Sequence, residues 1–389
     1  MKILHAAALL RPPSGIVYQM KVELEAARQL DLDWSVKMFC PSNWMAPSDV
    51  LQFAKTVNAE PKDKSSLAKL MDWIRLRAEY HQWLESQEAE VDVFVLRHYV
   101  HDPFQLRFLR KCRKPIYLVH HTLETHELRS PGNLSAKIRT CLEEFLGNRS
   151  IRESEATIGV TREIINYEIE RSRQAGRKFI IYPNGISFQG DSPSDHRGEV
   201  PEILFVAGYF IDWHGLDKLL DSIERSDSSF VLHLVGDLSL SDMERAKKDP
   251  RIVLHGKLPQ TEIRSLSERC WIGLSSFALD RKNMEEACTL KVREYLMHGL
   301  PVYAGHREVL PDHFAYYRRG EAKIDEIVAY CGQMRGVSRQ DVRAASKPYI
   351  DKVDLLADLN REIMKNQGAK GTGTALGKPT RSFETNCQQ

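Results

Sequence analysis

The strongest constraint on the fold of this 389-residue chain is an alternation of short apolar segments with longer amphipathic ones. Residues 92–96, 115–119 and 156–160 are short and almost continuously apolar, as parallel strands buried on both faces are. Residues 16–30 and 65–86 have the periodicity of helices instead. Strands separated by helices predict an α/β protein with a doubly wound parallel sheet.

The alternation occurs twice, on either side of a polar segment rich in Ser, Asp, Gly and Pro. A chain of this length is long for one core, so two α/β domains are expected. The predicted divisions are an N-terminal domain at 1–186, a hinge at 187–200, a second domain at 201–345, a helical segment at 346–366 that returns to the first domain, and a tail at 367–389. The tail lacks apolar periodicity, and we expect it to be disordered.

Composition excludes several classes of protein. A net charge of +2 argues against a dedicated nucleic-acid binder, and no apolar run is long enough to span a bilayer. The seven cysteines are scattered without a Cys-x-x-Cys pair, which indicates reduced thiols in the cytoplasm and no zinc site. The basic cluster at 107–114 suits either an anionic lipid or a phosphorylated ligand, although a solvated helix end is the simpler interpretation.

The most informative local sequence runs from Glu286 to Val302 and contains a second glutamate, Glu294. On one helix the two carboxylates would lie about 80° apart in azimuth and about 12 Å apart along the axis, too far to share a metal or a proton. With Glu286 in the loop before the helix, they suit the two ends of an elongated ligand. Gly299 and Pro301 predict that the helix ends near residue 298.

The expected start of this helix, near Leu290, offers a site for an anion. Backbone N–H groups in the first turn lack partners within the helix, and the helix dipole is positive there. Lys291 is an unfavourable residue in a first turn, which suggests that an anion such as a diphosphate binds beside it.

Five sequence pieces together resemble the retaining GT-B glycosyltransferases of family 4, over most of residues 1–365. They are Tyr182-Pro-Asn-Gly-Ile186, the segment from Ala207 to Asp217 around Gly208 and Gly215, Leu234-Val-Gly-Asp237, His255-Gly256-Lys-Leu-Pro259, and the block from Glu286 to Val302. The resemblance implies GT-B architecture, in which two Rossmann-like domains face a central cleft. It also implies transfer from a nucleotide-diphosphate sugar with retention, and no metal or other cofactor.

The resemblance implies roles for particular residues of the second domain. Glu294 would bind the ribose hydroxyls and Glu286 the donor sugar. The backbone at Thr289, Leu290 and Lys291 would hold the diphosphate, with Lys291 as a catalytic cation. Gly236 and Gly256 would line the base and ribose end of the nucleotide, and Gly208 and His214 would also contact the donor.

The sequence departs from the family pattern after the first strand of the second domain. The family usually has an Arg and a Lys there, which neutralise the leaving diphosphate, whereas Tyr209 and His214 stand at the corresponding positions. The charge must then come from elsewhere, and Lys291, Arg281 and Lys282 are the candidates. For the last two a solvated loop is the preferred interpretation.

In the first domain, Gly15 matches a glycine loop against the donor phosphates, in a predicted loop at 12–15; a simple turn is an equal alternative. His121 matches a histidine that approaches the reacting sugar, and His120 is the alternative match. Arg97 closes a strand on the acceptor side. His120, His121 and His126 also suggest a metal cluster, which we rank low because no carboxylate or cysteine supports it at ligand spacing.

The sequence therefore predicts a hexosyltransferase with a UDP- or GDP-linked donor and a glycan or lipid-linked acceptor, acting in polysaccharide biosynthesis. A cytoplasmic location with peripheral contact at the inner face of the membrane is expected, and no nucleic-acid partner. Two alternatives remain open. One is a nucleotide-sugar epimerase of the same fold, and the other is an inactive GT-B module that binds a nucleotide or glycan.

Overall fold

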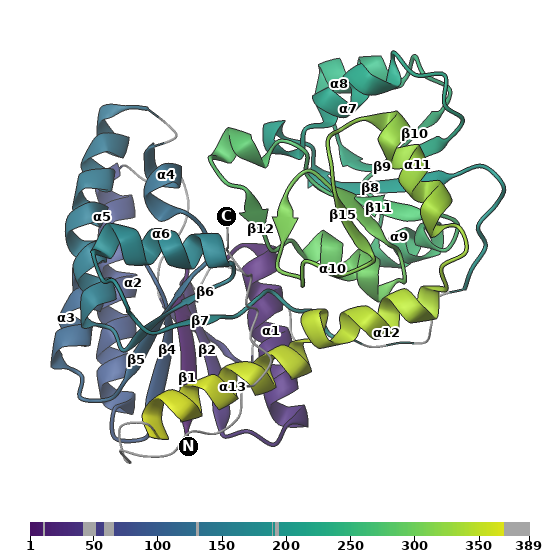
Figure 1. The fold of residues 1–389 in the computed structure, drawn as a ribbon. Coiled ribbons are helices and arrows are strands. Elements are labelled where there is room, and N and C mark those ends of the chain that lie inside the picture. Colours follow the sequence, from purple (N-terminus) through teal and green to yellow (C-terminus); the bar gives the residue numbers. More distant parts are fainter. Residues whose placement is uncertain are drawn as a thin grey trace. The chain divides into compact units, whose positions relative to one another are not determined.

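The computed structural model describes residues 1–10, 12–41, 52–57, 66–129, 132–188, 190 and 194–368. The chain forms two compact units, one of residues 1–187 with Leu355–Asn360 and one of the remaining residues from Phe188 onward (Figure 1). The tail expected to be disordered lies, from residue 369, outside the described residues.

Unit 1 contains one sheet of parallel strands in the order β3-β2-β1-β4-β5-β6-β7. The strands are β1 (Ile3–Ala8), β2 (Trp34–Pro41), β3 (Ala54–Val57), β4 (Val93–Arg97), β5 (Ile116–His120), β6 (Ala156–Gly159) and β7 (Phe179–Ile181). The order reverses between β1 and β4, and in open α/β sheets ligands bind at the carboxyl ends of strands beside such a reversal.

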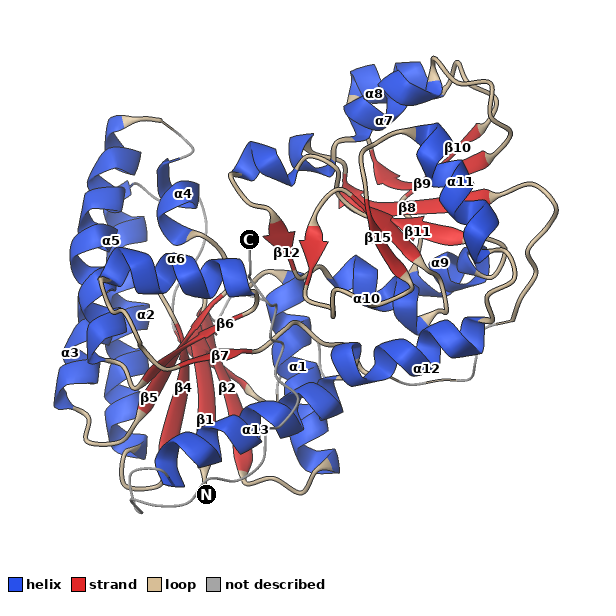
Figure 2. Ribbon diagram, viewed as in Figure 1, coloured by secondary structure: helices blue, strands red, loops and turns tan. Residues whose placement is uncertain are grey.

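The described helices between these strands are α1 (Ser14–Gln29), α2 (Ser66–Gln87), α3 (Pro103–Lys111), α4 (Glu124–Arg129), α5 (Leu134–Glu153) and α6 (Arg162–Ser172). Figure 2 shows helices flanking the strands of each unit. The core is continuous across layers, because Leu76 and Tyr80 of α2 and Phe108 of α3 pack with Phe94 and Leu118 of the sheet.

Unit 2 repeats the topology with parallel strands in the order β10-β9-β8-β11-β13-β15. These are β8 (Glu202–Tyr209), β9 (Val231–Asp237), β10 (Ile252–Gly256), β11 (Ile272–Leu274), β13 (Val302–Ala304) and β15 (Tyr317–Arg319). The two-residue strands β12 (Glu286–Ala287) and β14 (Arg307–Glu308) pair separately. The prediction of two doubly wound parallel sheets is therefore confirmed.

The remaining elements are the short 3₁₀ turns η1 (Asp212–His214) and η2 (Leu279–Lys282), and the helices α7 (Leu216–Ile223), α8 (Leu240–Ala246), α9 (Gln260–Ser267), α10 (Leu290–Met297), α11 (Ile324–Met334), α12 (Arg339–Ile350) and α13 (Lys352–Gly368). Within α13, Leu355–Asn360 group with unit 1. Of the segment expected to act as a hinge, Arg197 bonds to the carbonyl oxygens of Met334 and Val337 in unit 2. Among the described helices, none has the length and apolarity that crossing a membrane requires.

One predicted loop is a helix. Residues 12–15 were expected to form a loop, but α1 begins at Ser14, so Gly15 lies in its first turn. Pro13 is the N-cap with extended backbone angles, which is compatible with its fixed φ. Gly15 is therefore not held in the left-handed backbone conformation that would favour a glycine at this position.

Candidate functional site

The candidate site in unit 2 is built on the first turn of α10. The strand β12 pairs in parallel with β14, in the register Glu286↔Arg307 and Ala287↔Glu308, and Thr289 then caps the helix with extended backbone angles. Glu286 was expected in a loop; it lies instead, half-buried, in this short strand. The Oγ1 atom of Thr289 is buried without a hydrogen-bond partner. The site therefore has a capped helix start whose first N–H groups have no partner within the helix.

A buried ion pair between Arg293 and Glu308 holds the start of α10 in place. Arg293 and Glu308 have fully buried side chains, and Arg293 Nη1 lies 2.8 Å from Glu308 Oε1. Arg293 also donates to the carbonyl of Thr289 at 3.2 Å, and Glu308 accepts from the backbone N–H groups of Val309 and Thr289 at 2.8 and 3.4 Å. Burial raises the pKa of Glu308, against the lowering effect of Arg293. Sequence analysis missed this pair, which ties β14 to α10.

Lys291 supplies a cation in the first turn of α10. Its Nζ atom is buried and has no hydrogen-bond partner among the described residues, although part of the residue reaches the surface. The Nζ atom lies 5.4 Å from the centroid of the Phe205 ring. Burial lowers the pKa of Lys291 from 10.5 to about 7, and Glu294 opposes that shift. A buried ammonium of this kind lacks the counter-ion that a bound anion would supply.

Glu294 lies one turn after Lys291 on the same helix. Burial raises its pKa from 4.5, and a hydrogen bond from Gln260 of α9 and the charge of Lys291 oppose the shift. A half-buried carboxylate without a matched cation can accept hydrogen bonds from hydroxyl groups. Lys291 and Glu294 thus present one cation and one acceptor a turn apart.

The loop after β8 brings no second cation to Lys291. Tyr209 is half exposed, and His214 is buried, with its Nδ1 atom 3.0 Å from the backbone N–H of Ile211. Burial, followed by the charge of Lys291, lowers the pKa of His214 to about 3, so its imidazole is neutral. Neither Tyr209 nor His214 therefore supplies a positive charge beside Lys291.

The other two candidate cations have partners on the surface. Arg281 forms hydrogen bonds with both carboxylate oxygens of Asp217, at 3.0 and 2.6 Å, and with the carbonyl of Asp212. Lys282 lies 5.0 Å from the ring of Trp213. Both residues are exposed, as the solvated interpretation predicts, although they lie in the 3₁₀ turn η2 and Arg281 links it to the start of α7.

The glycines at the strand ends differ in how closely other atoms pack around them. Gly236 has a φ of 126°, and a Cβ atom there would lie 1.7 Å from the carbonyl oxygen of Ala207 on β8. Gly256 has a φ of 63° with no described atom within 4 Å of a Cβ, and Gly208 is likewise open. Close strand packing therefore requires Gly236, whereas Gly208 and Gly256 leave free space at the carboxyl ends of β8 and β10.

In unit 1, His120 ends β5 and is completely buried. Its ring stacks on that of His98 at 4.5 Å, and its Nδ1 atom lies 3.0 Å from Glu124 Oε1 and 3.3 Å from Glu168 Oε2. Burial lowers the pKa of His120 to about 4, so the ring is neutral. His121 is the next residue and is partly exposed. A small molecule would therefore reach His121 first.

The residues around His120 overturn one premise of the sequence analysis. No carboxylate was expected at ligand spacing, yet atoms of His120, Glu124 and Glu168 lie within 4.8 Å of one another. Arg171 already pairs with this cluster, at 2.6 Å from Glu168 and 2.9 Å from Glu143. A guanidinium beside the same oxygens would repel a metal ion, so this group does not fit one. The third histidine, His126, packs instead on the ring of Tyr167.

The buried carboxyl groups of this cluster have pKa values shifted in opposite directions. Burial would raise the pKa of Glu124, but its interactions with His120 oppose that effect, and the pKa is lowered well below its usual value. Burial and then the charge of Glu124 raise the pKa of Glu168 well above its usual value. Arg97, at the end of β4, has its pKa lowered by burial, with Glu124 and Glu127 opposing the shift.

The segment from Tyr182 to Ile186 is anchored on α1 by residues that sequence analysis did not select. Glu23 of α1 accepts hydrogen bonds from Tyr182 Oη and Trp34 Nε1, both at 2.9 Å. Gln19, one turn earlier, bonds both the carbonyl and the N–H of Gly185, at 2.7 and 3.0 Å. The Tyr-Pro-Asn-Gly segment thus has a structural role in closing unit 1.

Comparisons with solved structures identify the class of fold. The lipopolysaccharide outer core galactosyltransferase WaaB has a TM-score of 0.66 at 14% identity, over 94% of this chain and 99% of WaaB. Anabaena HepE, in complex with UDP and glucose, has a TM-score of 0.58 at 16% identity, over 94% of this chain and all of HepE. A UDP-GlcNAc 2-epimerase from Neisseria meningitidis bound to UDP-GlcNAc has a TM-score of 0.51 at 14% identity, over 94% and 99% of the two chains.

This chain has the GT-B fold that these structures represent, with two parallel-sheet α/β domains. No family model matches the sequence, and no curated protein matches it. The fold is therefore defined, and the chemistry must be argued from the site.

Proposed function

We propose that this chain is a retaining glycosyltransferase of the family 4 type, which moves a sugar from a nucleotide-diphosphate sugar to a glycan or lipid-linked acceptor. The observation that carries the proposal is the buried, unpartnered ammonium of Lys291 in the first turn of α10, with Glu294 one turn further on. The cation suits a diphosphate and the carboxylate suits ribose hydroxyls. A UDP- or GDP-linked sugar presents both groups in this order.

The donor would bind mainly to unit 2. The N–H groups of Leu290 and Lys291 would hold the diphosphate, Glu286 would accept from the donor sugar hydroxyls, and the open surfaces at Gly208 and Gly256 would admit the nucleotide. Gly236 and His214 would shape this surface without binding the charged groups of the ligand, because Gly236 packs against β8 and the imidazole of His214 is neutral.

Bond breaking builds negative charge on the diphosphate and positive charge on the sugar ring. Lys291 and the preorganised N–H groups of α10 would stabilise the former, which makes a metal unnecessary. The leaving phosphate would take the proton of the acceptor on the same face of the sugar, so that the configuration is retained. Glu286 then has a positioning and electrostatic role rather than a nucleophilic one.

Unit 1 would provide the acceptor side. His121 is the proposed contact to the reacting sugar, and His120 is a positioning residue held by His98 and Glu124. Arg97, beside Glu124, is proposed to face the acceptor, and Gly15 at the start of α1 to lie near the donor phosphates. We also propose a cytoplasmic location at the inner face of the membrane; the free thiols of the described cysteines support the cytoplasmic part of this proposal.

The first experiment is a thermal-shift screen with UDP-, GDP- and ADP-sugars, followed by turnover with the sugar that stabilises the protein. Exchange of Lys291 for Met should lower turnover more than donor affinity, because the charge on the leaving diphosphate is greatest in the transition state. Loss of donor affinity with unchanged turnover would mean that Lys291 binds the ground state and the transition state equally, and would contradict its catalytic role.

An epimerase is the second candidate, because UDP-GlcNAc 2-epimerases share this fold. Incubation of the pure protein with UDP-GlcNAc alone, followed by NMR spectroscopy, separates the two. Appearance of the epimeric nucleotide sugar without an acceptor would contradict the transferase proposal. Binding without turnover under any condition would favour a module made inactive by Tyr209 and His214.

A further inference from the structure

The helix α5 of unit 1 turns its apolar side outward. Its large apolar side chains Leu134, Ile138, Leu142 and Phe145 are 73%, 53%, 45% and 55% exposed. They are spaced by four, four and three residues, so they share one face of the helix. The buried positions of α5 carry mostly small or polar residues: Ala136, Thr140, Glu143, Gly147, Ser150 and Ile151. This is the reverse of the usual arrangement of a surface helix.

The inner face of α5 is polar because it serves the cluster around His120. Glu143 accepts from His98 and pairs with Arg171, at 3.0 and 2.9 Å. Gly147 leaves room for that carboxylate, since a Cβ there would lie 2.0 Å from Glu143 Oε1. The four exposed apolar side chains of α5 are therefore not part of the described core of unit 1. Four large apolar side chains exposed on one helix face indicate a binding surface.

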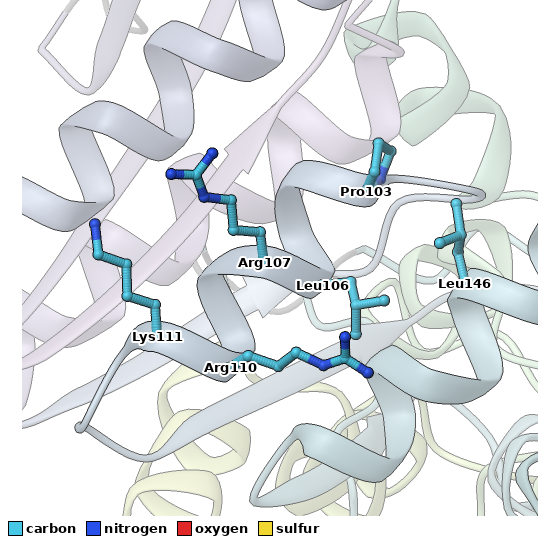
Figure 3. A pocket seen from close by; sticks show the side chains of 6 residues that line it. All are labelled: Pro103, Leu106, Arg107, Arg110, Lys111 and Leu146. Atoms are coloured by element: carbon cyan, nitrogen blue, oxygen red, sulfur yellow. The ribbon is translucent and has the colours of Figure 1, made fainter.

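The surface beside this apolar stripe is basic. Residues 103–114, which contain α3, include five basic residues and no acidic one. Arg107, Arg110 and Lys111 line an open depression of about 380 Å³ together with Pro103, Leu106 and Leu146 of α5 (Figure 3).

The charges of this depression are available to a partner. Arg110 and Lys111 each pair with one acid at 3.1 Å while remaining more than half exposed, and such pairs are weak. Arg107 has no ion pair within the described part of the chain. On α5 itself, the guanidinium of Arg149 lies over the ring of Phe145 at 3.6 Å. An apolar stripe with basic residues at its edge suits a lipid bilayer that carries negative headgroups.

A second copy of the chain suits this face less well. A two-fold contact centred on residues 103–114 would place the basic segment of one copy against that of the other, and no acidic residue of this segment could compensate. We propose that α5 lies in the headgroup region of an anionic membrane, with Leu134, Ile138, Leu142 and Phe145 inserted and Arg107, Arg110 and Lys111 at the lipid phosphates. This proposal specifies which surface makes the membrane contact named in the proposed function, and it does not depend on the transfer chemistry.

Flotation of the full chain with vesicles tests the proposal. The protein should float with vesicles of phosphatidylcholine and phosphatidylglycerol, should stay behind with phosphatidylcholine alone, and should be released as salt increases. The variant Phe145→Ser should reduce binding about tenfold, because one of four inserted side chains is lost. Its control, Leu240→Ser, removes an exposed apolar side chain from α8 and should bind as the parent does.

A second pair of variants tests the charge. Arg107→Gln should weaken binding to the anionic vesicles several-fold, whereas Lys247→Gln, which removes an exposed basic residue from unit 2, should leave it unchanged. Equal binding to neutral vesicles, no flotation with either composition, or equal effects of a variant and its control would overturn the proposal. So would light scattering that shows a dimer disrupted by Phe145→Ser. Donor binding measured on the same samples distinguishes failure here from failure of the proposed function.

Discussion

Lys291 should take up a proton when the donor binds, and the size of this effect follows from its burial. In the free protein its pKa is lowered to about 7, so at pH 8 only about 10% of the lysine is protonated. A diphosphate beside the ammonium restores the charged form, which gives an uptake of about 0.9 proton at pH 8. At pH 6 the lysine is already about 90% charged, and the uptake should fall to about 0.1 proton.

Calorimetric titration with UDP-glucose, in buffers of different ionisation enthalpy, measures this number directly. UDP-glucose is suitable because its diphosphate is esterified at both ends and does not titrate between pH 6 and 8. The variant Lys291→Met should bind more weakly and take up almost no proton. Binding by the parent protein without proton uptake at pH 8, or uptake that persists in Lys291→Met, would refute the assignment of this lysine to the diphosphate.

The remaining predictions concern single positions of unit 2. Glu294→Ala should weaken nucleotide binding by about 1.5–3 kcal/mol, the value of a hydrogen bond to a charged acceptor, and unchanged affinity by calorimetry would contradict its ribose role. Gly236→Ala should destabilise unit 2 in urea by about 3 kcal/mol or more because its Cβ meets the carbonyl of β8, whereas Gly256→Ala should cost only about 1 kcal/mol for its positive φ. Arg293→Met should destabilise the protein by about 3–5 kcal/mol, since Glu308 is left buried without a partner, and adding Glu308→Gln should restore part of the loss in urea unfolding.

Unfolding should also depend on pH through Lys291. Because burial lowers its folded pKa from 10.5 to about 7, the unfolded chain binds more protons between these values, and the contribution of this lysine to stability rises with pH across that window. The free energy of unfolding of the parent minus that of Lys291→Met should therefore increase from pH 7 to pH 10. A difference that stays constant would contradict the lowered pKa.

The sequence was sufficient where periodicity and local stops decide the structure. The short apolar segments predicted both parallel sheets, and Gly299 with Pro301 predicted the end of α10 within one residue. The loop at 12–15 was predicted wrongly because a proline pair suggests a turn, although proline is also compatible with a helix start. For α3 only the basic end was predicted as helical, although Asp102 and Pro103 mark its start, where Asp102 accepts a hydrogen bond of 2.9 Å from the N–H of Phe104.

The site needed contacts between residues distant in the sequence. Lys291 was selected because a lysine is unfavourable in a first turn, and the structure adds that its ammonium is buried without a partner. Glu308 and Glu23 have no local pattern, because their roles depend on Arg293 and Tyr182, the latter 159 positions away. The carboxylates around His120 were missed for the same reason. Only Glu124 had a local signal that could have been read, because it follows His120 by four positions at the start of a helix.

The central claim is that the first turn of α10 binds the diphosphate of a nucleotide sugar. A crystal structure of the protein with UDP tests it most directly. The account predicts phosphate oxygens within hydrogen-bond distance of the N–H groups of Leu290 and Lys291 and of Lys291 Nζ, with the ribose hydroxyls on Glu294. A nucleotide bound elsewhere, with Lys291 and Glu294 not in contact with it, would contradict the account.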